Sequence, residues 1–203
     1  MRGTPISKVL LHQLYVQKKK SSRIISKELQ CSENKVNYWL SKHNISKRSI
    51  TEAVYTHHNP DGDPFYFKNP KTPQEWFLYG LGLGLYWGEG NRKNEMAVRL
   101  GNTDPALIKV FLEFLQKTYS VKKEKMRFGI QIFSDMSVSK EIHFWSRYLN
   151  IPKSQFWNPI TTPARSIGTY KEKTKHGVLT VYVSNTKFRD LLVHEIEMIS
   201  KMR

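Results

Sequence analysis

Apolar residues recur with helical spacing over the first 50 positions of the chain. We expect three short helices there, at residues 6–17, 22–29 and 33–42. Ser32 stands directly before the third helix, where a serine side chain can cap free backbone N–H groups. The apolar side chains that the second helix is expected to turn inward are Ile24, Ile25 and Leu29. The pattern therefore predicts a small three-helix domain over residues 1–50.

The second and third of these helices are separated by a tight turn at Gln30-Cys31. Such a turn is typical of the helix-turn-helix arrangement, in which the start of the recognition helix enters the major groove of DNA. Asparagine suits paired contacts with adenine, and lysine suits guanine or phosphate. The candidate DNA-binding residues of this domain are Glu33, Asn34, Lys35, Asn37, Tyr38 and Lys42, with Arg23 beside a phosphate. A three-helix bundle with a solvated charged face is the alternative.

Helical spacing fades after about Tyr55. The stretches 59–64 and 69–73 are rich in Asn, Pro, Asp and Gly, which are turn-forming residues. We therefore expect residues 51–74 to form a linker between the first domain and a second one at 75–203.

Residues 75–203 mix helical and strand spacing, which predicts a mixed α/β domain. The expected elements are strands at 95–101, 127–133 and 178–183 and helices from Asp104-Pro105 onward, at 138–149 and at 187–200. In 127–133, Phe128, Ile130 and Ile132 alternate with Arg127 and Gln131, so one face of this strand is apolar and the other polar. The predicted fold class is α+β: a three-helix domain followed by a mixed α/β domain.

Residues 76–88 carry no charge and contain four glycines, and Glu89 follows directly. Each glycine inside a helix costs about 1 kcal/mol relative to alanine. Gly80, Gly84 and Gly88 recur every fourth residue, so they share one helix face on which a second helix can pack very closely. The run is shorter than the roughly 20 apolar residues that cross a bilayer, so it predicts a tightly packed helix that ends at one carboxylate.

This segment resembles the motif of the LAGLIDADG family of homing endonucleases, in a single-copy and degenerate form. Gly84 and Gly88 match the small helix-contact residues of that motif, Glu89 its metal-binding acid and Gly90 its closing glycine. The acid is Glu where the family usually has Asp, and Trp87 stands at an earlier acidic position.

The resemblance implies a homodimer that pairs its motif helices and lays an antiparallel sheet on double-stranded DNA. In that arrangement Glu89 of two subunits would hold Mg²⁺ or Mn²⁺ at the scissile phosphates, with Lys171, Lys173 or Lys175 stabilising nearby charge. The helix at 138–149 would then be either an insertion or a second motif helix that has lost its glycines and acid.

Charge supports a polyanionic partner. The 203-residue chain holds 33 Lys and Arg against 17 Asp and Glu, a net charge of +16, and this excess is shared by both predicted domains. The polar residues that we expect on the DNA-facing side of the sheet and its loops are Arg92, Lys93, Arg99, Arg127, Gln131, Arg165 and Lys171. A single cysteine and the lack of an apolar leader favour a cytoplasmic, nucleoid-associated protein without a membrane partner.

The leading functional hypothesis is a site-specific DNA-binding protein of the homing-endonuclease type that cleaves DNA by metal-dependent phosphodiester hydrolysis. One alternative is a transcriptional regulator that keeps the fold without cleavage, which the Glu89 and Trp87 departures favour. A second alternative is an RNA-binding accessory of intron splicing.

Overall fold

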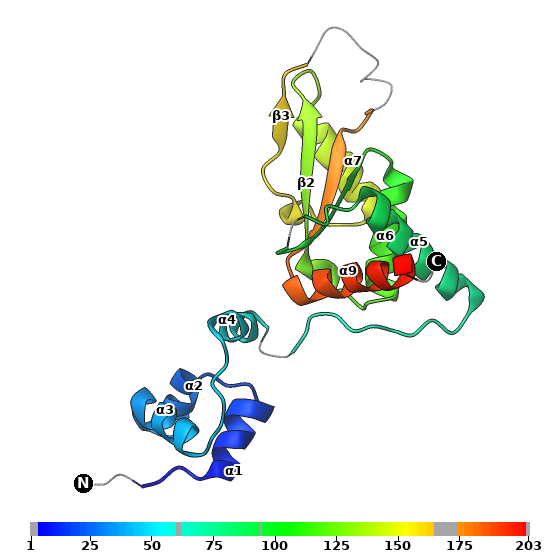
Figure 1. The fold of residues 1–203 in the computed structure, drawn as a ribbon. Helices are drawn as coiled ribbons and strands as arrows, with labels where there is room; N and C mark the ends of the chain where they lie inside the picture. The colour runs from blue at the N-terminus through cyan, green and yellow to red at the C-terminus, as the bar shows by residue number, and fades with distance from the viewer. Residues whose placement is uncertain (1–3, 60–61, 94, 165–173, 202–203) are drawn as a thin grey trace. The chain divides into compact units, whose positions relative to one another are not determined.

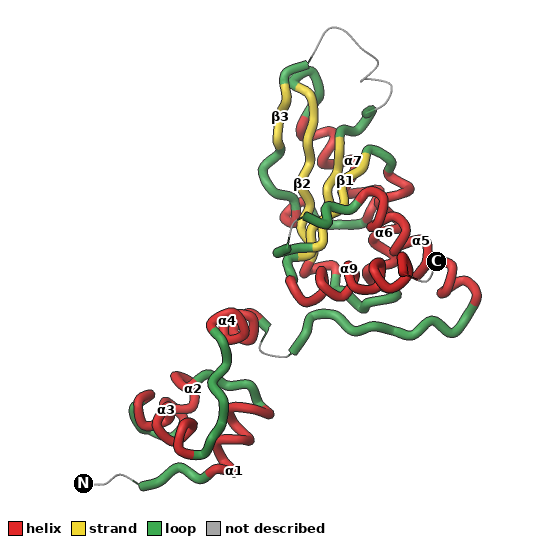
Figure 2. Tube along the Cα trace, in the orientation of Figure 1, coloured by secondary structure: helices red, strands yellow, loops and turns green. Residues whose placement is uncertain are grey.

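The computed structural model describes residues 4–59, 62–93, 95–164 and 174–201 (Figure 1). The chain forms two compact units, Met1–Asp63 and Pro64–Arg203, each with its own apolar core. The first unit is helical within its described residues, and the second combines helices with a sheet (Figure 2). The α+β class is therefore confirmed.

The first unit follows the predicted helical pattern with one addition. Its elements are α1 (Lys8–Leu11), which continues as the π-helix η1 (His12–Gln17), α2 (Ser22–Glu28), α3 (Glu33–Lys42) and α4 (Ile50–His58). Ser21 and Ser32 cap α2 and α3, because each hydroxyl accepts a hydrogen bond from the backbone N–H three residues on, at 3.2 Å. Gln30, in the turn between the two helices, has a left-handed backbone with φ of 47°.

The core of this unit lies under α2 and α3. It buries Leu11, Ile25, Val36 and Leu40 completely. The prediction that Ile24 faces inward is wrong, since 47% of this side chain is exposed. Neighbouring residues on a helix point about 100° apart, and Ile25 already fills the narrow inward face of this short helix.

The segment predicted as a linker is more structured than its composition indicates. Its first part forms α4, and residues after 63 pack on the second unit as an extended strand-like segment. The backbone N–H groups of Tyr66 and Lys68 donate to the carbonyls of Tyr119 and Thr118, at 2.8 and 2.7 Å. Local turn residues such as Asn59 and Pro64 mark breaks between elements here rather than an unstructured connection.

A four-stranded sheet organises the second unit. Its strands are β1 (Val98–Asn102), β2 (Met126–Phe133), β3 (Ile160–Thr162) and β4 (Val178–Val183), in the order β1-β4-β2-β3. Strand β4 pairs antiparallel with both β1 and β2, but β3 runs parallel to β2. The expectation of an antiparallel sheet is thus wrong at this edge. A helix between β2 and β3 carries the chain back to the starting end of the sheet, as parallel pairing requires.

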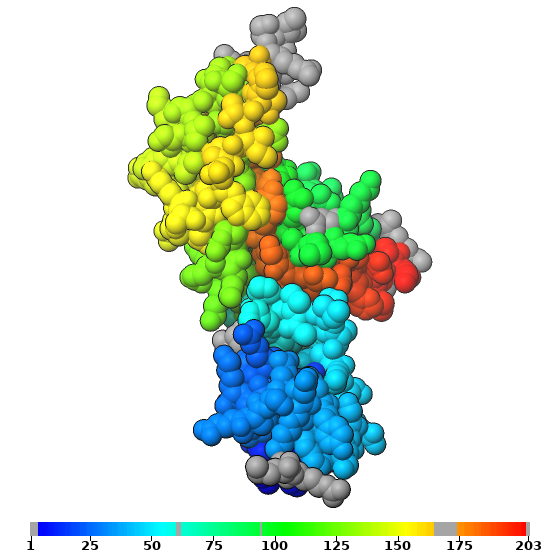
Figure 3. Space-filling view, turned by 90° about the vertical axis from the view of Figure 1, so that its left-hand side faces the viewer, coloured from blue at the N-terminus to red at the C-terminus, as the bar shows by residue number. Residues whose placement is uncertain are grey.

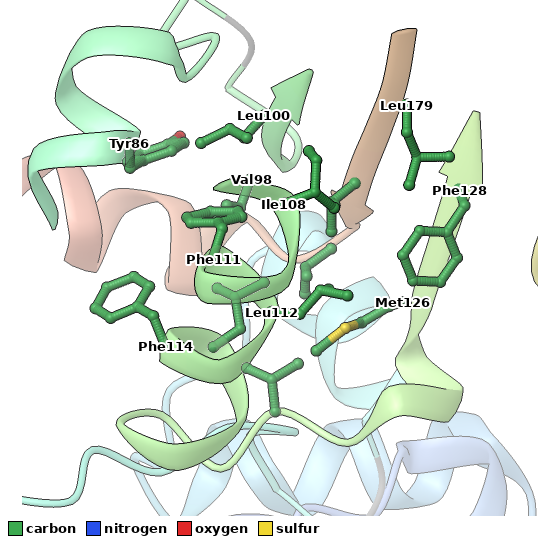
Figure 4. Close-up of a cluster of buried hydrophobic side chains, with 14 of the residues drawn as sticks. Tyr86, Val98, Leu100, Ile108, Phe111, Leu112, Phe114, Met126, Phe128 and Leu179 are labelled. Atoms are coloured by element: carbon green, nitrogen blue, oxygen red, sulfur yellow. The ribbon is translucent and has the colours of Figure 1, made fainter. Parts of the chain in front are cut away.

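Helices cover one face of this sheet (Figures 1 and 2). They are α5 (Pro73–Glu89), α6 (Pro105–Lys117), α7 (Val138–Leu149) and α9 (Thr186–Lys201), with short 3₁₀ turns η2 (Lys123–Lys125) and η3 (Lys153–Gln155). Aromatic and aliphatic side chains of α5 and α6 meet the apolar face of β1, β2 and β4, including Tyr86, Phe111 and Phe128 (Figure 4). The opposite face of the sheet carries no helix among the described residues.

The uncharged segment forms α5 as predicted. Thr72 and Glu75 form a reciprocal capping box, and Pro73 occupies the first helical position. Gly82 allows α5 to pack closely on α6, because a Cβ at this position would lie 2.1 Å from Cγ of Phe114 on α6. By contrast, a Cβ at Gly80, Gly84 or Gly88 would meet nothing within 4 Å. The predicted glycine face is therefore open in the single chain.

Candidate nucleic-acid interface

The open face of the sheet gathers polar and basic side chains into rows. Strand register places Arg99 of β1 beside Tyr182 of β4, and Tyr182 beside Arg127 of β2. One row further along, Gly101, Thr180 and Gly129 lie side by side. The side chains of β2 alternate strictly between buried and outward, so Arg127 and Gln131 are exposed on this face as predicted.

Neighbouring groups hold these side chains in place. The guanidinium carbon of Arg99 lies 4.8 Å from the ring centre of Tyr182, and its Nη2 donates to the tyrosine hydroxyl at 3.3 Å. Nη1 of Arg127 donates to the carbonyls of Glu124 and Met126, both at 2.8 Å. Nε2 of Gln131 donates to Oγ1 of Thr162 at 3.0 Å. A fixed orientation lowers the entropy lost when such groups bind a ligand.

One donor on this face lacks a partner. The Nε of Arg99 is buried, and no acceptor among the described residues lies within hydrogen-bond distance. Buried donors are nearly always satisfied in folded proteins, so this nitrogen is an exception on the open face.

The end of α5 is tied to the edge strand of the same sheet. Gly90 forms an isolated bridge with Leu100, and the backbone N–H of Asn91 donates to the carbonyl of Arg99 at 2.9 Å. Glu89 is exposed directly before this junction, and Arg92 and Lys93 are exposed in the turn after it. The backbone thus brings the predicted acid to the edge strand that carries Arg99.

Glu89 is the carboxylate at this junction that the sequence predicts as a metal ligand. Over the described ranges, no group of three or more His, Cys, Asp or Glu side chains is placed to hold an ion. The oxygen chemistry of Glu89 fits Mg²⁺ or Mn²⁺, but one carboxylate does not complete a site. A second copy of the chain would have to supply another.

Three of the predicted basic site residues fall outside the described residues, namely Arg165, Lys171 and Lys173. Lys175 is described and exposed. His176, next to it, is anchored to α7, because its ring stacks on Phe144 with centres 3.4 Å apart and Nδ1 lies 2.8 Å from a carboxylate oxygen of Glu141.

In the first unit, the predicted reading face surrounds the start and middle of α3. Glu33, Asn34 and Tyr38 are exposed, whereas Lys35 and Asn37 are half-buried. Oδ1 of Asn37 accepts from the hydroxyl of Ser22 on α2 at 3.0 Å, so this side chain also fastens the two helices together. The exposed candidates that remain, Arg23 and Lys42, lie on α2 and at the end of α3.

A half-buried acid that the sequence did not single out lies behind α5. The carboxylate of Glu195 on α9 accepts hydrogen bonds from the hydroxyls of Tyr79 on α5 and of Tyr119 after α6. Burial raises the pKa of Glu195, although both hydroxyls oppose the rise, and burial together with the Glu195 charge raises the pKa of Tyr79 to about 12. The pKa of Tyr119 is raised for the same reasons. This cluster fastens the glycine-rich helix to the rest of the unit.

Comparison of the chain with family models, with curated proteins and with solved structures finds no match. Among the described residues, no helix combines the length and apolar character needed to cross a membrane.

Proposed function

We propose that the chain binds double-stranded DNA at specific sites through the open face of its sheet, as a homodimer of the homing-endonuclease type. The observation that carries this proposal is the row Arg99–Tyr182–Arg127, with Gln131 on the same face. Arginines position a protein on phosphates and read guanine, and an amide side chain reads adenine. A net charge of +16 supports a polyanionic partner.

The open side of α5 supports pairing of two chains. Phe77 is 71% exposed, Leu81 is 37% exposed, and both lie beside the uncovered Gly80 and Gly84. A second copy of the same helix can approach such a face closely, and a two-fold pair uses the same surface on both subunits. Parallel pairing through Gly80, Gly84 and Gly88 would bring the C-terminal ends of the two helices, and with them two Glu89 carboxylates, toward each other.

Paired Glu89 side chains are the proposed centre of DNA cleavage. They would hold Mg²⁺ or Mn²⁺, which when bound activates water and stabilises the leaving oxygen of a phosphodiester. Arg92 and Lys93 follow Glu89 in the chain and are exposed, so they are suited to hold the phosphates on either side. Lys175 is the described candidate for stabilising charge, together with Lys171 and Lys173.

The first unit is proposed to act as a helix-turn-helix module that extends the contacted DNA. The caps of α2 and α3 and the tight turn between them support this assignment. Asn34 at the exposed start of α3 is suited to base contacts, and Arg23 is suited to phosphate.

One observation favours a non-catalytic regulator as the second candidate. Trp87, at the position where the resembled motif has an acid, is half-buried and packs against the main core. It therefore serves packing rather than chemistry, and the motif retains Glu89 as its one carboxylate.

A cleavage assay separates the two candidates. Duplexes that the protein selects from a random-sequence library are incubated with Mg²⁺ or Mn²⁺ and with wild type, Glu89→Gln or the exposed control Glu197→Gln. The endonuclease proposal predicts cuts by wild type and Glu197→Gln that Glu89→Gln loses while it still binds. Selected sites that no variant cuts would establish the regulator instead. Preference for structured RNA competitor over duplex DNA would point to the splicing accessory.

A further inference from the structure

An exposed tryptophan lies on the open face of the sheet. Phe156 forms a bridge with Phe128 and packs its ring inward on the ring of Phe128, with centres 5.7 Å apart. The next residue, Trp157, donates its backbone N–H to the carbonyl of Phe128 at 2.9 Å. Because neighbouring side chains of an extended segment point to opposite faces and Phe156 points inward, Trp157 points to the open face. Of this large side chain, 45% is exposed. In the view from this side, the yellow segment that contains Trp157 and the orange strand β4 both reach the surface (Figure 3).

Trp157 pairs with Tyr182 across an intervening strand. The two rings lie 4.4 Å apart at 52°, although β2 separates the segment of Trp157 from β4. Gly129 of β2 makes this contact possible, because a Cβ there would lie 3.1 Å from Cε2 of Tyr182. The rings thus meet above a position without a side chain. We call Trp157 and Tyr182 the aromatic platform.

Two arginines lie beside Tyr182 of the aromatic platform. Arg99 stacks on Tyr182 from β1, and Arg127 lies next to Tyr182 on β2. The arginine on β1 and its hydrogen bond fix the orientation of Tyr182, so the platform is formed before any ligand binds. Rigid aromatic rings between arginines are the combination by which proteins stack unpaired bases while holding the adjoining phosphates.

We propose that the aromatic platform stacks an unpaired nucleobase, so that the open face prefers DNA whose strands are locally separated over fully paired duplex. The inference rests on the proposed function, in which nucleic acid binds this face, and adds that the two DNA strands are locally separated there. In a fully paired duplex the faces of the bases are hidden by their neighbours, and only their edges are accessible in the grooves. Strand separation exposes a base face to Trp157, while Arg99 and Arg127 contact the phosphates on either side.

The test compares two fluorescein-labelled DNAs of the same length, one fully paired and one with a short central mismatched bubble, by fluorescence anisotropy at constant salt. Stacking on one aromatic side chain makes a roughly tenfold difference in affinity. We expect the full-length wild type to bind the bubble about tenfold more tightly. Trp157→Ala should lose this preference and still bind the paired duplex, whereas Trp157→Phe, which keeps a ring, should retain most of it.

The control is Tyr66→Ala, which removes a more exposed aromatic ring, 71% against 45% for Trp157, from the extended segment after residue 63. It should leave both affinities unchanged. If wild type and Trp157→Ala bind both DNAs with equal affinity, the stacking inference is overturned and the proposed function stands. If wild type binds neither DNA, the proposed function itself fails.

Discussion

Gly82 and Gly84 are two residues apart on α5 but lie in different surroundings, so substituting each of them tests the packing of this helix. A Cβ at Gly82 would lie 2.1 Å from Cγ of Phe114, a fully buried side chain. Ordinary carbon–carbon contacts are about 3.5–4.0 Å, so the ring or the helix would have to move by more than about 1 Å. A Cβ at Gly84 would meet nothing within 4 Å.

The expected free-energy changes have opposite signs. Alanine in place of glycine favours a helix by about 1 kcal/mol, and Gly84→Ala should gain this amount in the monomer. Gly82→Ala gains the same propensity but overpacks the core, which costs about 1–3 kcal/mol and more when neighbours cannot move. Since Phe114 is 0% exposed, we expect Gly82→Ala to be destabilised by about 2 kcal/mol overall.

The assay is urea unfolding followed by tryptophan fluorescence, which reports mainly on the second unit because four of the five tryptophans lie there. It is run at several protein concentrations and read at the lowest, where any dimer has dissociated. Sedimentation at high concentration completes the test, since Gly84→Ala should weaken self-association. Equal loss of stability in both variants would refute the assignment of Gly82 to the inner face and Gly84 to the open face.

The remaining predictions concern the open face of the sheet and the half-buried acid Glu195. Arg127→Ala should weaken DNA binding and lower the slope of the logarithm of the binding constant against the logarithm of salt concentration by about 1. The control Arg147→Ala removes an exposed arginine on α7 and should change neither quantity. An equal effect of the two variants would contradict binding through the open face of the sheet. Because the pKa of Glu195 is raised in the fold, the native state binds its proton more tightly, so wild type should lose stability as pH rises above the unfolded value of 4.5. Glu195→Gln should remove that loss in urea midpoints measured from pH 4.5 upward, and an unchanged pH profile would show that another group is responsible.

Local patterns were sufficient to predict the elements whose signals lie within a few residues. The cap Ser32, the Asp104-Pro105 helix start and the alternation through β2 all appear in the structure where the sequence placed them. The first strand begins at Val98 rather than at residue 95, because only its last residues pair with β4. Caps and alternation are local, and so are readable from sequence.

Features that depend on distant partners were missed. The strand β3 has three residues and too short a pattern to recognise, and its parallel pairing with β2 depends on the intervening helix α7. Glu195 meets Tyr79 and Tyr119 across separations of 116 and 76 residues, with no local sign of the cluster. The alternation of apolar and polar residues placed Arg127 and Gln131 on the open face, but the encounter of Trp157 with Tyr182 needed the register of three strands.

DNA recognition by the open face can be tested by selecting bound duplexes from a random-sequence library at moderate salt, with wild type and with an Arg99→Ala, Arg127→Ala double variant. We expect wild type to enrich a near-palindromic site, as a two-fold dimer requires, and the double variant to lose this enrichment. Failure of wild type to enrich any sequence, or enrichment of the same site by the double variant, would contradict DNA recognition through the open face of the sheet.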